Sequence, residues 1–302
     1  MDTPLAFPVR LQAENTIYVL DETKLPFEET YIEVKTLNDA LKVLGQMKTR
    51  AFGQVLLFFY MCVLEGSVDD VTKAFQDTRP TFDFSLLADI LKRRAKKTST
   101  LKEAAESIIR GLDEQKRTRA RRLAEILPRD AHILTICNVS GELIYLYEAL
   151  KGIGKTATFF VSETRPYLQG TRLTFWELSR AHIPAHVLCD NQAAIVMKNG
   201  LINCVVTGSD RSTERGDIIN KIGTYAIARL SRYFGIPLYV LIQFPSDIVV
   251  EAISIEERPA QEVFMWLDGK DPWPEALYPS FDITPSNFIS GWIDILGEVR
   301  CS

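Results

Sequence analysis

The chain has 302 residues, and 46% of them are hydrophobic, which is enough apolar material for one large core or two ordinary ones. Its 35 lysines and arginines are outnumbered by 39 aspartates and glutamates, so the net charge of -4 creates no basic field that would attract nucleic acid. We therefore expect a two-domain protein that has a small-molecule ligand and no nucleic-acid partner.

No segment of the sequence indicates a membrane protein or an exported one. The longest apolar run, residues 55–64, is about half the ~20 residues that a membrane-spanning helix requires, and it favours a buried helix. Residues 1–10 carry an acid and two prolines and lack a basic region followed by an apolar stretch. We expect a cytosolic protein without a membrane partner.

The cysteines favour neither disulfides nor a metal. The five of them are far apart, none belongs to a Cys-x-x-Cys pair, and only three histidines accompany them. This pattern argues against a disulfide framework and a structural zinc site, and we expect no metal and no cofactor. Each cysteine taken alone is most simply a small buried apolar residue, so a functional cysteine has to be indicated by its position.

The first part of the chain, residues 1–128, is predicted to be a mostly helical domain. After a short strand candidate at 17–21, apolar residues recur at helical spacing. The predicted helices span residues 37–47, 53–64, 68–76, 85–96 and 101–127. The basic run at 116–122 keeps helical spacing with Leu112, Leu123 and Leu127, so we interpret it as a solvated helix face.

From residue 129 to residue 302 the pattern changes to β-branched runs that alternate with amphipathic stretches. The predicted strands are 133–136, 158–161, 185–188, 204–207 and 238–242. The predicted helices between them are 142–150, 173–181, 193–198 and 221–234. This alternation predicts an α/β fold with a parallel sheet that is covered by helices on both faces.

Open parallel sheets bind their ligands beyond the carboxyl ends of the strands. The residues that follow the predicted strands are polar or reactive, in contrast to the apolar runs before them. They are Cys137 and Asn138, residues 162–165, Asp190 and Asn191, and residues 208–211. The sequence therefore predicts a ligand site at this edge of the sheet.

Cys137 and Asp210 are the candidate catalytic residues. A cysteine and a carboxylate at neighbouring strand ends can divide the proton transfers that move a carbonyl between C1 and C2 of a sugar. The helix predicted to begin near Ser140 would favour a thiolate at Cys137. The alternatives left open are a space-filling cysteine and an aspartate paired with Arg211 or Arg215.

Several residues are candidates for binding an anion. Asn220 and Lys221 stand at a predicted helix start, where free N–H groups favour phosphate; the alternative for Asn220 is a simple N-cap. Arg165 lies on a loop stiffened by proline and suits phosphate or carboxylate, although a salt bridge with a neighbouring acid explains it equally well. Arg50 and Arg79 are the candidates in the helical domain.

Four segments carry a resemblance to a known family. They are Ile-Leu-Thr-Ile-Cys-Asn at 133–138, Glu-Thr-Arg-Pro through Trp-Glu-Leu at 163–178, Gly-Ser-Asp-Arg at 208–211, and Gly-Asp-Ile-Ile-Asn-Lys-Ile-Gly-Thr at 216–224. In this order they resemble the family of 5-methylthioribose-1-phosphate isomerases, ribose-1,5-bisphosphate isomerases and regulatory subunits of translation initiation factor 2B. The run 168–178 is most similar to the methylthioribose-phosphate branch, and so are residues 255–258 and 281–285 near the chain's end.

The resemblance implies a helical N-terminal domain followed by a Rossmann-like domain, and a homodimer. It implies that Cys137 and Asp210 are the catalytic pair, which the regulatory subunits generally lack. The sugar-phosphate contacts of the family would fall on Gln169, Asn220 and Lys221, and on Arg79.

The chain departs from the family around Arg50. Family isomerases carry Arg-Gly-Ala-Pro-Ala-Ile-Gly where this chain has Arg50, Ala51 and Phe52, so these three residues are candidate substrate contacts and Phe52 would reshape the pocket. The resemblance implies an aldose–ketose isomerase for a 1-phosphorylated pentose, foremost 5-methylthioribose 1-phosphate. The alternatives are 5-deoxyribose 1-phosphate or ribose 1,5-bisphosphate as the substrate, and a non-catalytic regulatory subunit that senses a sugar phosphate or nucleotide.

Overall fold

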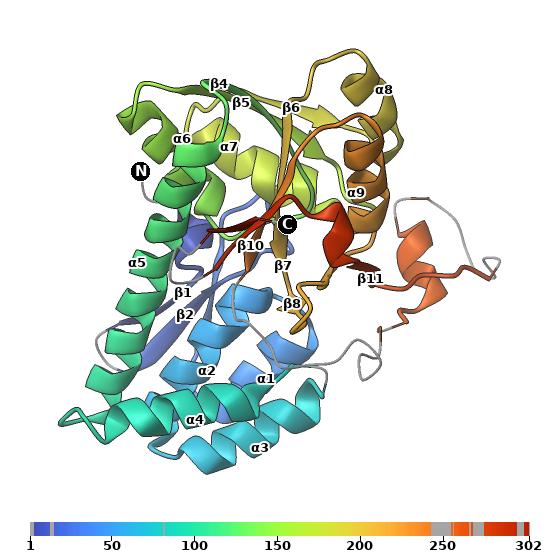
Figure 1. Ribbon diagram of the computed structural model, residues 1–302. Helices are drawn as coiled ribbons and strands as arrows, with labels where there is room; N and C mark the ends of the chain where they lie inside the picture. Colours follow the sequence, from blue (N-terminus) through green and yellow to red (C-terminus); the bar gives the residue numbers. More distant parts are fainter. Residues whose placement is uncertain are drawn as a thin grey trace. The chain divides into compact units, whose positions relative to one another are not determined.

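The computed structural model describes residues 3–12, 15–80, 82–242, 255, 257–265, 267, 275–294 and 299–301 (Figure 1). The chain forms two compact units, Asp2–Glu114 and Gln115–Ser302. The division falls inside the long helix α5 (Leu101–Ile126), whereas the boundary expected from the sequence, at residue 128, lies just after the end of this helix.

The N-terminal unit combines a small antiparallel sheet with helices. The sheet has the order β1 (Val9–Gln12), β2 (Thr16–Leu20), β3 (Tyr31–Val34), and a short 3-10 turn precedes it at Pro4–Ala6. The helices are α1 (Leu37–Gly45), α2 (Ala51–Glu65), α3 (Val68–Thr78), α4 (Phe84–Ala95) and the first half of α5. The predicted helices are confirmed, and β2 is the strand that the sequence indicated.

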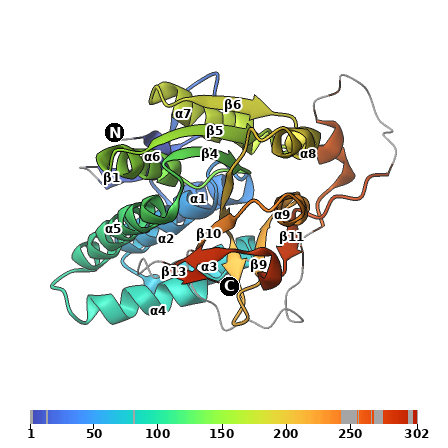
Figure 2. The same ribbon diagram turned by 45° about the horizontal axis from the view of Figure 1, so that its top comes forward.

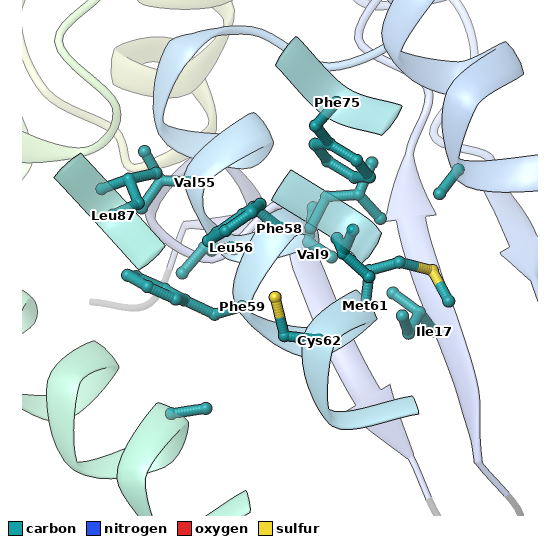
Figure 3. Close-up of a cluster of buried hydrophobic side chains, with 14 of the residues drawn as sticks. Val9, Ile17, Val55, Leu56, Phe58, Phe59, Met61, Cys62, Phe75 and Leu87 are labelled. Atoms are coloured by element: carbon teal, nitrogen blue, oxygen red, sulfur yellow. The ribbon is translucent and has the colours of Figure 1, made fainter. Parts of the chain in front are cut away.

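The core of this unit forms around α2, which is apolar on nearly all sides and contributes nine of its fifteen residues to the interior. Phe58 of α2 packs against Phe75 of α3 and Phe84 of α4, with ring centroids 5.6 and 5.5 Å apart. Figure 3 shows Phe58 and Phe75 together with side chains of the sheet, of which Val9 and Ile17 are labelled. A helix that is hydrophobic all round must be buried on every side, and this determines its central place in the unit.

The C-terminal unit is built on a seven-stranded sheet. Six strands are parallel, in the order β12 (Gly291–Ile293), β10 (Leu238–Ile242), β7 (Cys204–Ser209), β4 (Asp130–Thr135), β5 (Thr156–Ser162), β6 (Ala185–Leu188). The edge strand β13 (Val299–Cys301) pairs antiparallel with β12. Numbered along the parallel set, this order is 3-2-1-4-5-6 read from β6, which is the Rossmann order, so the predicted α/β fold is confirmed.

Helices cover both faces of this sheet. The helices are α6 (Glu142–Gly152), α7 (Trp176–Arg180), α8 (Ala193–Lys198) and α9 (Thr224–Tyr233). In Figures 1 and 2, α8 and α9 lie on one side of the strands and α6 on the other. Alternate strand residues are buried toward each face: Leu134 and Val205 share a cluster with α8 and α9, and Ile133 and Val206 point the opposite way.

Several shorter elements complete the unit. A π-helical segment, Gly170–Phe175, leads directly into α7. A second, three-stranded sheet has the order β11 (Phe281–Thr284), β9 (Ile218–Lys221), β8 (Arg211–Ser212), and all its pairs are antiparallel. Short 3-10 turns lie at Asp190–Gln192, Ala260–Phe264 and Ser286–Phe288. Among the described residues, no helix is both long and apolar enough to cross a membrane.

Candidate active site

The two predicted catalytic residues flank the point at which the strand order reverses. From β4 the chain builds β5 and β6 on one side, and β7 and β10 on the other, so the switch point lies between β4 and β7. Cys137 follows the end of β4, and Asp210 directly follows β7. Leu134 of β4 pairs with Val205 of β7. Three residues further along each chain, this register sets Cys137 opposite Gly208. Open α/β sheets bind their ligands beyond the carboxyl ends of the strands at such a point.

Cys137 has a strained backbone that side chains hold in place. Its φ of 63° lies in the left-handed region, which costs a non-glycine residue about 1–3 kcal/mol. The Cys137 N–H donates to Thr164 Oγ1 at 3.0 Å, and the Thr174 hydroxyl donates to the Cys137 carbonyl at 2.5 Å. A disfavoured backbone conformation persists only where the surrounding contacts hold it in place. Residues of this kind are common at functional sites.

The exposure of Cys137 separates it from the buried cysteines. Cys137 is partly exposed, whereas Cys62 and Cys204 are buried. Burial raises the pKa of both buried thiols to about 12, so neither forms a thiolate near neutral pH. These two cysteines fit the space-filling role, and Cys137 is accessible to a ligand.

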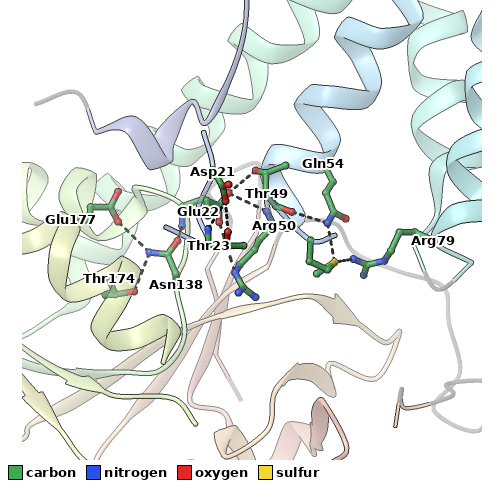
Figure 4. Close-up of polar contacts among 12 residues, drawn as sticks. Asp21, Glu22, Thr23, Thr49, Arg50, Gln54, Arg79, Asn138, Thr174 and Glu177 are labelled. Carbon is green, nitrogen blue, oxygen red and sulfur yellow. Dashed lines mark hydrogen bonds and ion pairs between the residues drawn. The ribbon is translucent and has the colours of Figure 1, made fainter. Parts of the chain in front are cut away.

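The segment from Cys137 to Gly141, here called the Cys137 loop, is ordered by Asn138. The Asn138 amide donates to Thr174 Oγ1 at 3.0 Å and to Glu177 Oε2 at 3.4 Å (Figure 4). Its carbonyl oxygen accepts from the Ser140 N–H at 2.8 Å. Helix α6 begins at Glu142, immediately after the loop, as the sequence predicted. The helix has no side-chain cap, because its N-cap is Gly141 with a φ of 85°.

Thr164 is held in turn by Asp190, which follows β6. The Asp190 carboxylate accepts from the Thr164 N–H at 2.8 Å, from the Arg165 N–H at 2.7 Å and from the Ser162 hydroxyl. The Thr164 hydroxyl donates to the Ser162 carbonyl at 2.9 Å. Asp190 therefore anchors the loop after β5, which positions the backbone of Cys137.

Among the residues that the structure describes, Arg165 forms no salt bridge of the kind that the sequence left open. Its guanidinium donates to the Val263 carbonyl at 2.7 Å, and its backbone N–H is the group that contacts Asp190. Within the described residues, Arg165 thus ties the loop after β5 to the 3-10 turn at 260–264.

Gln169 is buried directly before the π-helical segment. The next residue, Gly170, lies so close to β5 that an added Cβ would stand 1.7 Å from the Ser162 carbonyl oxygen. Only glycine permits this approach of two backbones. The predicted substrate contact Gln169 is therefore placed beside the carboxyl end of β5, which neighbours the strand that leads to Cys137.

Asp210 and Asn220 lie next to each other. Asp210 is exposed, and its N–H donates to the Ile219 carbonyl at 3.0 Å, which brings the end of β7 onto β9. The buried Asn220 amide donates to Thr207 Oγ1 of β7 at 2.9 Å and to Thr224 Oγ1 at 3.0 Å. The fold thus assembles a predicted substrate contact beside a predicted catalytic carboxylate.

The prediction that Asn220 and Lys221 open a helix is wrong. Both residues end strand β9, which pairs with β11, and α9 starts only at Thr224 after Gly223 turns the chain with a φ of 103°. The buried Lys221 ammonium lies 4.4 Å from the centroid of the Phe281 ring on the paired strand. Lys221 therefore offers a cation from a strand, in a setting that also suits a cation–π contact.

The N-terminus of α9 holds a carboxylate of the protein itself. Asp282 of β11 accepts from the Gly223 N–H at 2.7 Å and from the Tyr225 N–H at 3.1 Å. Burial raises the pKa of Asp282 to about 6, and these two backbone N–H groups oppose the increase without cancelling it. The anion contact expected at this helix start is thus made by Asp282.

Arg50 in the N-terminal unit neighbours a buried acid. Arg50 is the N-cap of α2; its N–H donates to Glu22 Oε1 at 3.1 Å, and its Nε lies 4.0 Å from Glu22 Oε2. Burial raises the pKa of Glu22, and the charge of Arg50 opposes this. Ala51 and Phe52 form the first turn of α2; Ala51 is exposed, and Phe52 packs against the core of the unit.

Arg79 follows α3 as its C-cap residue, and its guanidinium contacts the sulfur of Met47. The same sulfur is 3.5 Å from the Gln54 amide, which donates to the Thr49 carbonyl at 2.9 Å. Figure 4 shows this chain of contacts between Arg79 and the residues around Arg50.

The interpretation of the basic run 116–122 as a solvated face is wrong for two of its members. Lys116 and Arg119 are 2% and 1% exposed, whereas Arg121 and Arg122 are exposed. The Lys116 ammonium donates to the Ser140 carbonyl at 3.1 Å, and Arg119 pairs with Glu142. Helical spacing placed these residues on one side of α5 correctly, but it does not tell which side another element covers.

A shallow cavity lies elsewhere on the C-terminal unit. Its volume is about 320 Å³, and it is lined by Arg229, Arg232, Tyr233, Asn287 and Phe288, none of which the sequence singled out. Among the described residues, no group of three or more His, Cys, Asp or Glu side chains is arranged to hold a metal ion.

The chain is similar to known proteins in sequence and in fold. A match to the initiation factor 2 subunit family spans residues 64–301. A protein of Carboxydothermus hydrogenoformans named methylthioribose-1-phosphate isomerase is 35% identical, over 95% of this chain and 94% of its own length. The crystal structure of 5-methylthioribose 1-phosphate isomerase from Pyrococcus horikoshii has a TM-score of 0.81 at 25% identity, covering 99% of this chain and 95% of that one.

A translation initiation factor shares the fold as well. The crystal structure of the eIF-2B delta subunit from A. fulgidus has a TM-score of 0.79 at 24% identity, covering 97% of this chain and 95% of that one. Several relatives at 32–35% identity over at least 92% of this chain are isomerases, so the chain is an enzyme of the isomerase class. The family resemblance noted in the sequence is confirmed, and the chain belongs to the initiation factor 2 subunit family.

Proposed function

We propose that this enzyme converts a 1-phosphorylated pentose from the aldose to the ketose, with 5-methylthioribose 1-phosphate as its substrate and 5-methylthioribulose 1-phosphate as the product. The observation that carries the proposal is the placement of Cys137 and Asp210 on the two sides of the switch point, with Cys137 in a strained and held conformation. The substrate is suggested by the names of proteins to which the chain is similar.

The proposed reaction is an internal redox change that needs no external electron acceptor. The C1–O4 bond of the sugar ring breaks and O4 takes up a proton. The hydrogen on C2 moves to C1, and the C2 hydroxyl loses its proton as C2 becomes the carbonyl, so C2 is oxidised as C1, which keeps its phosphate, is reduced. Asp210 transfers protons to and from the sugar oxygens, and Cys137 assists the transfer of the hydrogen from C2. The hydrogen can move along an enediol path or as a hydride shift, and both paths use these two residues.

The proposed contacts divide by chemistry. Gln169 and Asn220 supply amides for the sugar hydroxyls, and Lys221 supplies a buried cation for the phosphate. Arg50, Ala51, Phe52 and Arg79 are proposed as further contacts on the strength of the resemblance. The homodimer implied by the resemblance is also part of the proposal, and light scattering of the purified protein tests it.

A substrate panel tests the proposal. The purified protein is incubated with 5-methylthioribose 1-phosphate, 5-deoxyribose 1-phosphate and ribose 1,5-bisphosphate, and ketose formation is followed by NMR. We expect the highest kcat/KM with the first compound, and no turnover of 5-methylthioribose, which lacks the phosphate. A preference for another member of the panel would replace the substrate, and turnover of none would favour the regulatory alternative.

A further inference from the structure

The Cys137 loop is strained at its far end as well as at Cys137. Ser140 has a φ of 50°, in the left-handed region, and it is followed by Gly141, also with a positive φ. Two non-glycine residues within one short loop thus adopt a conformation that L-amino acids disfavour. The threonine contacts at Cys137 hold one end of the loop, so the other end requires its own restraint.

Helix α5 supplies that restraint from two buried basic residues. Lys116 and Arg119 lie one turn apart on α5, and neither reaches solvent. Arg119 pairs with Glu142, the first residue of α6, and donates to the Ile242 carbonyl at the end of β10. This pair fixes the start of α6 against the sheet, directly after the loop.

Lys116 acts on the loop itself. Its ammonium donates to the Ser140 carbonyl at 3.1 Å, while the Ser140 N–H donates to Asn138 at 2.8 Å. Both backbone groups of Ser140 are therefore held, as both groups of Cys137 are. Burying an ammonium costs free energy, and a buried charged side chain that contacts a strained loop carries a specific structural role.

We propose that Lys116 is a positioning residue for Cys137: by holding the Ser140 carbonyl, it keeps the Cys137 loop in the conformation that presents the thiol at the switch point. The effect of Lys116 on turnover rests on the proposed function, because Lys116 acts through Cys137. The effect of Lys116 on the conformation of the loop is independent of the proposed function.

The test compares Lys116→Met with Lys116→Arg and with Arg122→Met. Arg122 is the matched control, since it belongs to the same basic run but is exposed and pairs along the helix with Glu125. Two quantities are measured: kcat and KM with 5-methylthioribose 1-phosphate, and the rate of alkylation of Cys137 by iodoacetamide relative to the exposed Cys189 of the same molecule, read by peptide mass spectrometry.

We expect Lys116→Met to lower kcat by about tenfold or more with KM within about twofold, because a displacement of about 1 Å at a catalytic group costs up to about a hundredfold. The ratio of Cys137 to Cys189 alkylation should change by at least about threefold. Lys116→Arg should recover most of both values, and Arg122→Met should match the wild type.

The proposal is overturned if Lys116→Met leaves the alkylation ratio unchanged, even when it lowers the melting temperature, because the role would then be merely structural. It is also overturned if Lys116→Arg recovers neither value. Should Lys116→Met not fold, Lys116→Gln, which keeps a polar end, is judged by the same criteria. The alkylation ratio needs no turnover, so it tests Lys116 even if the substrate panel fails.

Discussion

Replacing Gly170 by alanine should destabilise the C-terminal unit. The added Cβ would lie 1.7 Å from the Ser162 carbonyl oxygen and 3.0 Å from Thr164 Oγ1, whereas ordinary contact begins at 3.4 Å. The π-helical segment and the end of β5 would have to separate by roughly 1.7 Å to accommodate it. The obstacle is backbone, which cannot turn aside as a flexible side chain can.

The size of the effect follows from this geometry. Inserting one methyl group into a packed site costs about 1–3 kcal/mol, and we expect about 3 kcal/mol or more here because the clash is with a carbonyl group. The Ser162 carbonyl accepts the Thr164 hydroxyl, and that hydroxyl accepts the Cys137 N–H. The same substitution should therefore also lower turnover.

Gly152→Ala is the matched control in the same unit. Gly152 is the last residue of α6, and an added Cβ would meet nothing within 4 Å. Alanine there should change the free energy of unfolding by less than about 1 kcal/mol, in the stabilising direction.

Urea unfolding followed by tryptophan fluorescence measures the difference. All four tryptophans lie after residue 115, so the signal reports on the C-terminal unit. With a slope of about 2–3 kcal/mol/M, Gly170→Ala should lower the midpoint by about 1 M or more. Equal midpoints for Gly170→Ala and Gly152→Ala would refute the close approach of the two backbones.

Three further substitutions have defined outcomes. Thr174→Val removes the hydroxyl that donates to the Cys137 carbonyl and should lower kcat by about tenfold, whereas Thr174→Ser should stay near wild type in the same ketose assay. Gly208→Ala would place a Cβ 2.8 Å from Val139 Cγ1 in the Cys137 loop; we expect a lower melting temperature by calorimetry, recovered by a second change, Val139→Ala. Burial raises the pKa of Asp282 from 3.8 to about 6, so the folded chain holds this proton more tightly than the unfolded chain, and the stability that it contributes is lost as the pH rises through about 6. The free energy of unfolding of the wild type minus that of Asp282→Asn should therefore fall between about pH 4 and pH 7 in urea titrations, and a rise over this interval would contradict the stated pKa.

Much of the fold could be predicted from local patterns. The β-branched runs at β4, β5, β7 and β10 are buried on both faces, so they appear in the sequence as continuous apolar stretches. Cys137 and Asp210 stood out because a reactive or charged residue directly follows such a run. The strand order then placed the two residues on either side of the switch point, where open sheets bind their ligands.

The remaining features depend on contacts between distant residues. β1 and β3 have four residues each, with polar side chains among them, and gain their structure from pairing with β2. Asn220 and Lys221 become a strand because β11, some sixty residues later, pairs with β9.

The basic residues of α5 and the threonines around Cys137 were missed for a related reason. Helical spacing assigns Lys116 and Arg119 to one side of the helix, but the carbonyl of Ser140 and the carboxylate of Glu142 that they contact come from another element. The hydroxyls of Thr164 and Thr174 bond to the strained backbone of Cys137. The positive φ of Cys137 could not be predicted, because cysteine does not usually adopt this conformation.

The most direct test of the account is the turnover of 5-methylthioribose 1-phosphate by Cys137→Ser and by Asp210→Asn, measured beside Cys189→Ser as an exposed-thiol control. If both residues act on the substrate, each of the first two changes should lower kcat by about a hundredfold to ten-thousandfold, and the control should retain wild-type activity. Turnover of the substrate that survives both Cys137→Ser and Asp210→Asn at the wild-type rate would contradict the assignment of the active site.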